Sequence, residues 1–326
     1  MACQKFLGVL AILLTLVLVD AVSADPPKAP GGIYVAVGYG GRRIRSLDGF
    51  HWDNDTQWSD KAADNDDVLF NIAYGKGRFV AVGGSGVGHV LTTVDGKSWR
   101  ETAKPRGRVA TVAFGDGRFV AGHDGEFLVS PDGESWETGG KLDFRGGIHF
   151  RKSAFGNGVF VIVGDCDPEW KSPRVSCRCS THDGKSAASF DVDTPTARAI
   201  AFGAERFVVV GPDGLRESSA DGKRWEHQQK EAGEDFDGVV WTGRQFLVTG
   251  GKHAYTSPDG VQWKKEDFRV PCTVLYAKGD VFIGASWGGN LWHSSDGREW
   301  KKVEITPGMP SFEAVAYGTP GDAAGH

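Results

Sequence analysis

The residues in this 326-residue chain whose types and positions could do chemistry are charged side chains in otherwise apolar segments. Arg151, Arg198, Asp237 and Glu313 each lie four positions before an aromatic residue. The same count reaches Phe70, Ala110 and Cys272 in three similar segments. Paired arginines bind carboxylates well, so Arg151 and Arg198 are candidates for holding an anionic ligand or a peptide end. Paired carboxylates are typical of glycosidases, so Asp237 and Glu313 are weak catalytic candidates. The alternative is that the four charges only pair with one another.

Two further ligand-binding candidates lie near these positions. Arg108 precedes the counted residue Ala110 by two positions. Trp170 ends a segment, residues 165–170, that also holds three acidic residues and a cysteine. This segment is either a binding loop or, as we favour, a surface loop fixed by a disulfide.

The cysteines after the N-terminal segment are disulfide candidates, namely Cys166, Cys177, Cys179 and Cys272. Cys177 and Cys179 form a Cys-x-Cys sequence. This sequence lacks the two separate pairs of ligands that a structural zinc site needs, so a disulfide is favoured over a metal. Cys166 would pair with Cys177 or Cys179. The remaining cysteine would stay free, pair outside the chain, or reach Cys272, which would place the 165–170 segment as a lid over the charged residues.

Several chemistries are not predicted. The two Gly-Lys-Ser sequences lack the spacing of a P-loop, and no His-Glu-x-x-His or Gly-x-Ser-x-Gly motif is present. The net charge of −5 argues against a nucleic-acid partner. We therefore expect no cofactor, no metal and no nucleic acid.

The elements that must position these residues are marked by a repeated heptapeptide, [Ser/Thr]-x-Asp-Gly-x-x-Trp, which we call the box. It recurs roughly every 40 residues, a period typical of repeat architectures. Its aspartates are Asp48, Asp95, Asp132, Asp183, Asp221, Asp259 and Asp296, and its tryptophans are Trp52, Trp99, Trp136, Trp225, Trp263 and Trp300. Ala187 replaces the tryptophan of the fourth copy, which predicts looser packing there. We expect a structural role, with Ser/Thr and Asp closing a turn and Trp covering apolar surface between repeats.

Each box follows an apolar run, a glycine turn and a second apolar run, which indicates four antiparallel strands per repeat. Seven such repeats predict an all-β, seven-bladed β-propeller over residues 32–318, with a solenoid as the alternative. The first repeat lacks its first strand, and residues 312–318 resemble a first strand without a successor. The C-terminal strand is therefore expected to join the N-terminal blade and close the ring.

The repeat resembles the BNR or Asp-box-like repeats of secreted bacterial propellers. It is similar to the photosystem II assembly and stability factor type of propeller and to uncharacterised exported propeller proteins. One residue of the sialidase Asp-box, between Asp and Gly, is absent from every copy. The resemblance implies the propeller fold.

The two ends of the chain are expected to lie outside the propeller. Lys5 and the apolar run from Phe6 to Val19 indicate a signal peptide over residues 1–24, with a membrane anchor as the alternative. Residues 25–31 are a lead-in, and residues 319–326 a disordered tail. We expect a secreted or periplasmic protein without a membrane span after cleavage.

The boxes would lie on one face of the ring and the longer loops on the other, where the charged residues would surround the channel mouth. We expect a non-catalytic binding or assembly scaffold that contacts a protein, an extracellular glycan or a small anionic ligand on the loop-rich face. The alternatives are a carbohydrate-active hydrolase, sialidase-like or another glycosidase, and a structural envelope protein. No oligomeric state is predicted.

Overall fold

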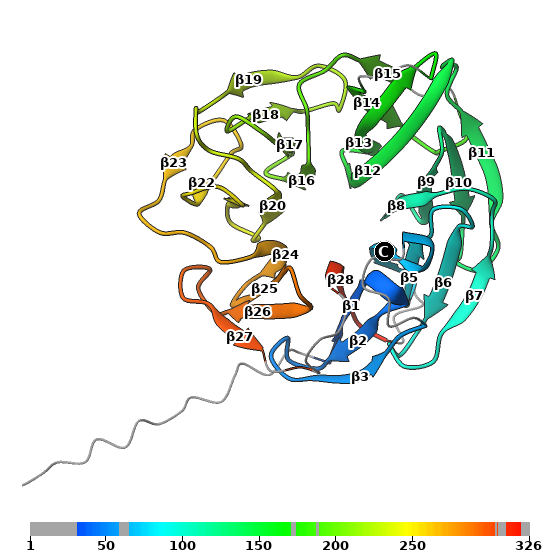
Figure 1. Cartoon of the computed structure of the whole chain (residues 1–326), viewed down its shortest axis with the longest axis horizontal. Helices are drawn as coiled ribbons and strands as arrows, with labels where there is room; N and C mark the ends of the chain where they lie inside the picture. The colour runs from blue at the N-terminus through cyan, green and yellow to red at the C-terminus, as the bar shows by residue number, and fades with distance from the viewer. Residues whose placement is uncertain are drawn as a thin grey trace, which may run out of the picture.

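The computed structural model describes residues 31–58, 65–170, 174–186, 189–303, 305 and 311–320. These residues form seven four-stranded antiparallel sheets arranged as blades around a central channel (Figure 1). The predicted seven-bladed β-propeller is therefore confirmed. The predicted signal peptide, most of the lead-in and residues 321–326 of the tail lie outside the described residues.

Strand order within every blade runs from the channel outward, and the blades follow the chain. Blade 1 contains β28 (Phe312–Gly318), β1 (Ile33–Gly38), β2 (Arg43–Ser46) and β3 (Trp52–Thr56). Blade 2 contains β4 (Leu69–Gly75), β5 (Arg78–Gly83), β6 (His89–Thr93) and β7 (Arg100–Ala103). Blade 3 contains β8 (Val109–Gly115), β9 (Arg118–His123), β10 (Glu126–Ser130) and β11 (Glu137–Lys141). Blade 4 contains β12 (Gly146–Gly156), β13 (Val159–Pro168), β14 (Val175–Thr181) and β15 (Ser189–Val192).

The remaining three blades follow, and blades 6 and 7 have the shortest outermost strands in the ring. Blade 5 contains β16 (Ala199–Gly203), β17 (Arg206–Val210), β18 (Arg216–Ser219) and β19 (Glu226–Gln229). Blade 6 contains β20 (Gly238–Trp241), β21 (Phe246–Thr249), β22 (Tyr255–Ser257) and β23 (Lys264–Lys265). Blade 7 contains β24 (Thr273–Lys278), β25 (Val281–Ser286), β26 (Asn290–Ser294) and β27 (Lys301–Val303). Two 3-10 turns, η1 (Tyr39–Gly41) and η2 (Asn65–Asp67), lie in the loops.

The ring closes through its two ends, as the sequence predicts. Strand β28 pairs with β1 in antiparallel register, with Ile33 opposite Gly318 and Tyr34 opposite Tyr317. The rings of Tyr34 and Tyr317 lie 4.7 Å apart, and Tyr276 of blade 7 lies 5.4 Å from Tyr34. Closure removes the free strand edges that an open array would expose.

Each box forms a tight turn between the third and fourth strands of its blade. In blade 3, the backbone amides of Glu134 and Ser135 each donate to Asp132 Oδ1 at 2.8 Å. The amide of Gly133 donates to Ser130 Oγ at 2.8 Å, and Gly133 adopts a φ of 75°. Glycine is favoured there because other residues resist positive φ.

The seam between blades 3 and 4 differs from the others because Ala187, which lies outside the described residues, replaces the box tryptophan. Phe144 and Phe190 pack there with their rings 5.3 Å apart. Cys166, Cys177 and Cys179 are buried in the same cluster. These side chains fill part of the seam, and looser packing of blade 4 stays a prediction.

Candidate functional site

The mouth of the central channel, on the loop-rich face, is organised by β-bulges in the first strands of four blades. The pairing of β4, β8, β12 and β28 skips one residue in each strand, namely Phe70, Ala110, Arg151 and Glu313. A bulge leaves the extra residue unpaired and re-aims its side chain. These are four of the seven residues that counting back from the aromatic residues reaches.

The count is wrong for blade 7. The register of β24 places Ala277, not Tyr276, opposite Phe282, and its bulge falls at Leu275. Cys272 is consequently buried in the core between blades 6 and 7. Thr273 lines the mouth in its place.

The two predicted anion-binding arginines are each held by carboxylates of this chain. Arg151 Nε donates to Asp165 Oδ2 at 2.8 Å. Arg198 Nη1 lies 2.8 Å from Asp237 Oδ1 and 3.0 Å from Asp235 Oδ1. Arg151 and Arg198 therefore do not form a free pair for an external anion, and the Arg198–Asp237 contact fits the charge-pairing alternative.

Glu313 and Lys152 form the inner part of the mouth. Lys152 Nζ donates to the backbone carbonyls of Phe70 at 3.4 Å and Glu313 at 3.3 Å. Burial raises the pKa of the Glu313 carboxyl, although Lys152 and Arg108 oppose this shift and Tyr39 donates a hydrogen bond. Burial also lowers the pKa of Lys152. Both groups are thus poorly hydrated, and each is partly compensated by the opposite charge of the other.

Arg108 adds a third cation beside Arg151 and Lys152. Its guanidinium lies 4.4 Å from the centre of the Phe70 ring, and its Nε is buried without a hydrogen-bond partner among the described residues. Burial lowers the pKa of Arg108, and the nearby charge of Arg151 lowers it further. An anion at the mouth would relieve this repulsion.

The mouth is open rather than sealed. A cavity of about 250 Å³ is lined by Lys152, Asp237, Trp287 and Glu313, among others. A second cavity of about 150 Å³ shares Lys152, Asp237 and Glu313 and continues along the first strands. The two candidate carboxylates therefore face common space.

Exposed aromatic side chains stand on loops of the same face. Trp170, on the loop after β13, is 75% exposed, and Trp287, on the loop after β25, is 78% exposed. The Trp287 ring packs edge-on against Tyr39, with centroids 5.8 Å apart. Tyr39 was not identified from the sequence. The Tyr-Gly-Gly sequence after β1 could have indicated a tight turn at this position, since Gly40 and Gly41 both adopt positive φ.

Residues 165–168 are not part of a surface loop as predicted, and residues 169–170 lie in the turn that follows them. Strand β13 extends through Pro168, and Asp165 pairs in register with His149 and with Ser176. The polar composition suggested a loop, but the long first strand of blade 4 supplies pairing partners as far as Gly146.

The four cysteines of the described residues are buried free thiols, so the predicted disulfides are absent from this structure. The thiols of Cys166 and Cys177 are hydrogen-bonded to each other. Cys272 belongs to a different core cluster, and the lid that a bond to it would create is not formed. In the described part of the chain, no group of three or more His, Cys, Asp or Glu side chains could hold a metal ion.

Comparison with known proteins supports the fold. No model of a protein family matches the chain, and no curated protein matches its sequence. A structure of YCF48 bound to D1 peptide superposes with a TM-score of 0.53 at 16% identity, covering 76% of this chain and 92% of that one. YCF48 from Cyanidioschyzon merolae gives 0.51 at 13% identity, covering 76% and 94%. The Swd1 propeller of Myceliophteria thermophila gives 0.53 at 12%, covering 73% and 87%.

These identities are low, so the likeness concerns the fold alone. At that level, the expected resemblance to photosystem II assembly-factor propellers is supported. Within the described residues, no helix has the length and apolar character needed to cross a membrane.

Proposed function

We propose that this chain is an exported, non-catalytic binding scaffold that holds a protein partner on its loop-rich face. The observation that carries the proposal is the exposure of Trp170 and Trp287, the two most exposed large hydrophobic side chains among the described residues. Exposed aromatic residues beside charges are typical of protein-binding surfaces. Export rests on the apolar segment from Phe6 to Val19.

The chemistry of the mouth indicates which part of the partner it would receive. Arg108, Arg151 and Lys152 gather there, and only Arg151 has a close carboxylate partner, Asp165. Asp237 and Glu313 line the same space. An acidic side chain or a terminal carboxylate of the partner would fit Arg108, whose Nε is buried without a hydrogen-bond partner among the described residues. In a narrower form of the same proposal, the mouth binds a small anionic or sugar ligand. The YCF48 structure with a D1 peptide supports a peptide role by analogy of fold.

The test compares two double variants that remove exposed apolar groups from opposite faces. Trp170→Ala/Trp287→Ala alters the loop-rich face, while Leu47→Ala/Val94→Ala removes the exposed apolar residues of two boxes. Proteins captured from the exported fraction should be lost with the first variant and retained with the second. Equal retention by both variants, with unchanged melting temperatures, would contradict the proposal.

A glycosidase is the second candidate, and one observation favours it. Asp237 and Glu313 line the same open cavities, and the pKa of Glu313 is raised by burial, as a general acid requires. A panel of fluorogenic glycosides, including a sialoside, tests this reading. Turnover that disappears in both Glu313→Gln and Asp237→Asn would establish the enzyme, whereas no turnover of any glycoside favours the scaffold.

A further inference from the structure

The seams between blades share one packing rule. In six of the seven seams, the box glycine of one blade packs against the residue that directly follows the aromatic residue near the start of the second strand of the preceding blade. A Cβ added to the glycine would lie within 3.4 Å of that residue. The residues concerned are Val35, Val80, Val120, Val161, Val208 and Ile283. All six are β-branched, so their bulk lies close to the backbone and closes the seam.

The seam between blades 6 and 7 breaks this rule. The corresponding residue of blade 6 is Leu247, whose branch lies one carbon farther from the backbone. The three atoms nearest to a Cβ on Gly297, the box glycine of blade 7, all belong to Phe282 of its own blade. An atom of the preceding blade is among the three nearest in each of the other six seams, but not here.

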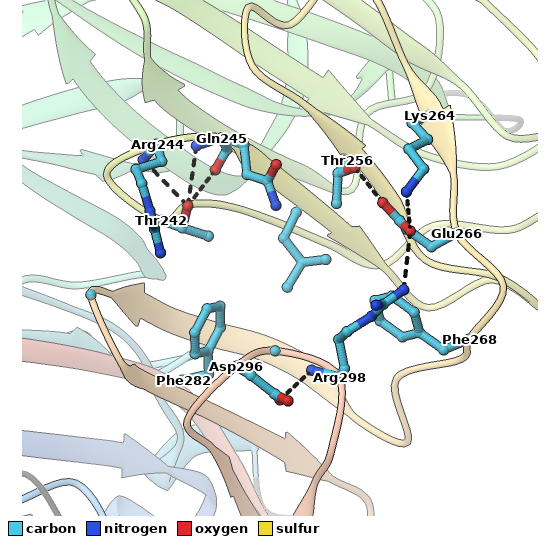
Figure 2. Close-up of a pocket in the computed structure, with 13 residues that line it drawn as sticks. Thr242, Arg244, Gln245, Thr256, Lys264, Glu266, Phe268, Phe282, Asp296 and Arg298 are labelled. Atoms are coloured by element: carbon cyan, nitrogen blue, oxygen red, sulfur yellow. Dashed lines mark hydrogen bonds and ion pairs between the residues drawn. The ribbon is translucent and has the colours of Figure 1, made fainter.

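A cavity of about 480 Å³ opens at this seam, on the turn face opposite the channel mouth (Figure 2). We call it the seam cavity. Its apolar lining includes Leu247, Phe268 and Phe282. This volume lies within the range of about 300–1,000 Å³ that is usual for small-molecule sites.

The polar side chains on one side of the seam cavity are hydrogen-bonded to one another. Glu266 is buried and accepts hydrogen bonds from Thr256 Oγ1 at 2.8 Å and Lys264 Nζ at 2.8 Å. Burial opposes ionisation of Glu266, but these hydrogen bonds outweigh it and hold its pKa below the usual value. Arg298 lies 3.5 Å from the same carboxylate and 4.7 Å from the centre of the Phe268 ring. This wall is therefore fixed in place before any ligand arrives.

The other side of the seam cavity carries an unused cation. Arg244 lies on the turn between β20 and β21, across the cavity from Lys264 and Arg298 in Figure 2. Its guanidinium has no ion-pair or hydrogen-bond partner among the described residues. Of the charged residues that line the cavity, Arg244, Lys264 and Arg298 are cations, and Glu266 and Asp296 are carboxylates. Arg298 also pairs with Asp267, outside the lining, at 3.1 Å. Asp296 is already engaged by the backbone amides of its own box.

We propose that the seam cavity is a second ligand site, independent of the channel mouth, which binds a small amphipathic carboxylate. The apolar body of the ligand would lie on Leu247 and Phe282, and its carboxylate would pair with the fork of Arg244. Because Arg244 is exposed, its ion pair adds only modestly to affinity, and burial of the apolar body supplies most of it.

The test uses 3-phenylpropanoate as the probe and follows backbone amide resonances of the intact folded chain. Saturable shifts at millimolar probe concentrations should appear at residues around Leu247, Phe282 and Arg298. Acetate, which lacks the apolar body, should give no saturable shift. 3-Phenylpropan-1-ol, which lacks the charge, should bind about fivefold more weakly than the carboxylate, the upper limit for an exposed ion pair.

Arg244→Ala should weaken 3-phenylpropanoate about fivefold and leave the alcohol unchanged. Lys76→Ala is the matched control, because Lys76 is an exposed cation on the corresponding turn of blade 2, whose seam is closed. It should not change binding. Equal affinity in wild type and Arg244→Ala, the absence of saturable shifts, or shifts confined to the channel mouth would overturn the proposal.

Discussion

At the scale of single residues, this propeller places carboxylates in two opposite electrostatic environments. Box aspartates accept backbone hydrogen bonds, and those from Arg224 and Lys223 lower the pKa of Asp221 to about 2. Glu313 lies in the channel, where burial raises its pKa.

Counting back four positions from the aromatic residues located Glu313 and Arg151, because most first strands have a bulge at this distance from their aromatic residue. The counting failed at Cys272, because the bulge of β24 falls at a different position. That position is set by strand pairing, which the residue types do not reveal.

The box aspartates should make stability fall in acid. A depressed pKa in the folded state gives stability that is present above the unfolded value of about 3.9 and is lost as pH falls towards 2. Asp221→Asn should lower the melting temperature at pH 7 and reduce the loss of stability between pH 4 and pH 2. A thermal melt series over this range measures both effects. An unchanged slope with pH would show that the hydrogen bonds to Asp221 do not stabilise the fold.

Glu313 should change the stability of the fold with pH in the opposite direction to the box aspartates. Its raised pKa means that the stability it contributes is present below the unfolded value of about 4.3 and is lost as pH rises through the folded value. Glu313→Gln should therefore melt at a higher temperature than wild type at pH 7 and at the same temperature near pH 4. If Glu313→Gln is less stable than wild type at pH 7, ionised Glu313 is better compensated by Lys152 and Arg108 than its pKa direction indicates.

At the scale of elements, the strands and turns follow from local patterns, because the box and the glycine turn recur in register. The seven blades and the closing strand could be predicted for that reason. The 165–170 segment could not, because its Asp-Cys-Asp-Pro composition is typical of a loop while its conformation is set by pairing with β12. The seam cavity likewise depends on the shape of Leu247 within a packed interface, which composition does not reveal.

Strand β28 should be essential for folding, since it is the innermost strand of blade 1 and touches β4 as well. Deleting residues 312–326 exposes the edge of β1 and removes the packing of Tyr317 against Tyr34. We expect loss of a cooperative melt and aggregation on size-exclusion chromatography. The control deletion of residues 321–326 should melt like wild type. A monomeric, cooperatively melting product of the longer deletion would contradict the closure role of β28.

At the scale of the whole molecule, the two faces of the ring have different composition. The turn face repeats the same hydrogen-bonded box turn, interrupted by the seam cavity between blades 6 and 7. The loop-rich face carries the open mouth, three gathered cations and the exposed Trp170 and Trp287. The central claim is that a protein partner binds the second face.

The most direct test is hydrogen–deuterium exchange of the chain with and without its captured partner. We predict slower exchange in the loop-rich face, at residues 84–88, 169–170 and 287–289, and unchanged exchange in the box turns. Slower exchange confined to the box turns, such as residues 95–98 and 132–135, would contradict the account.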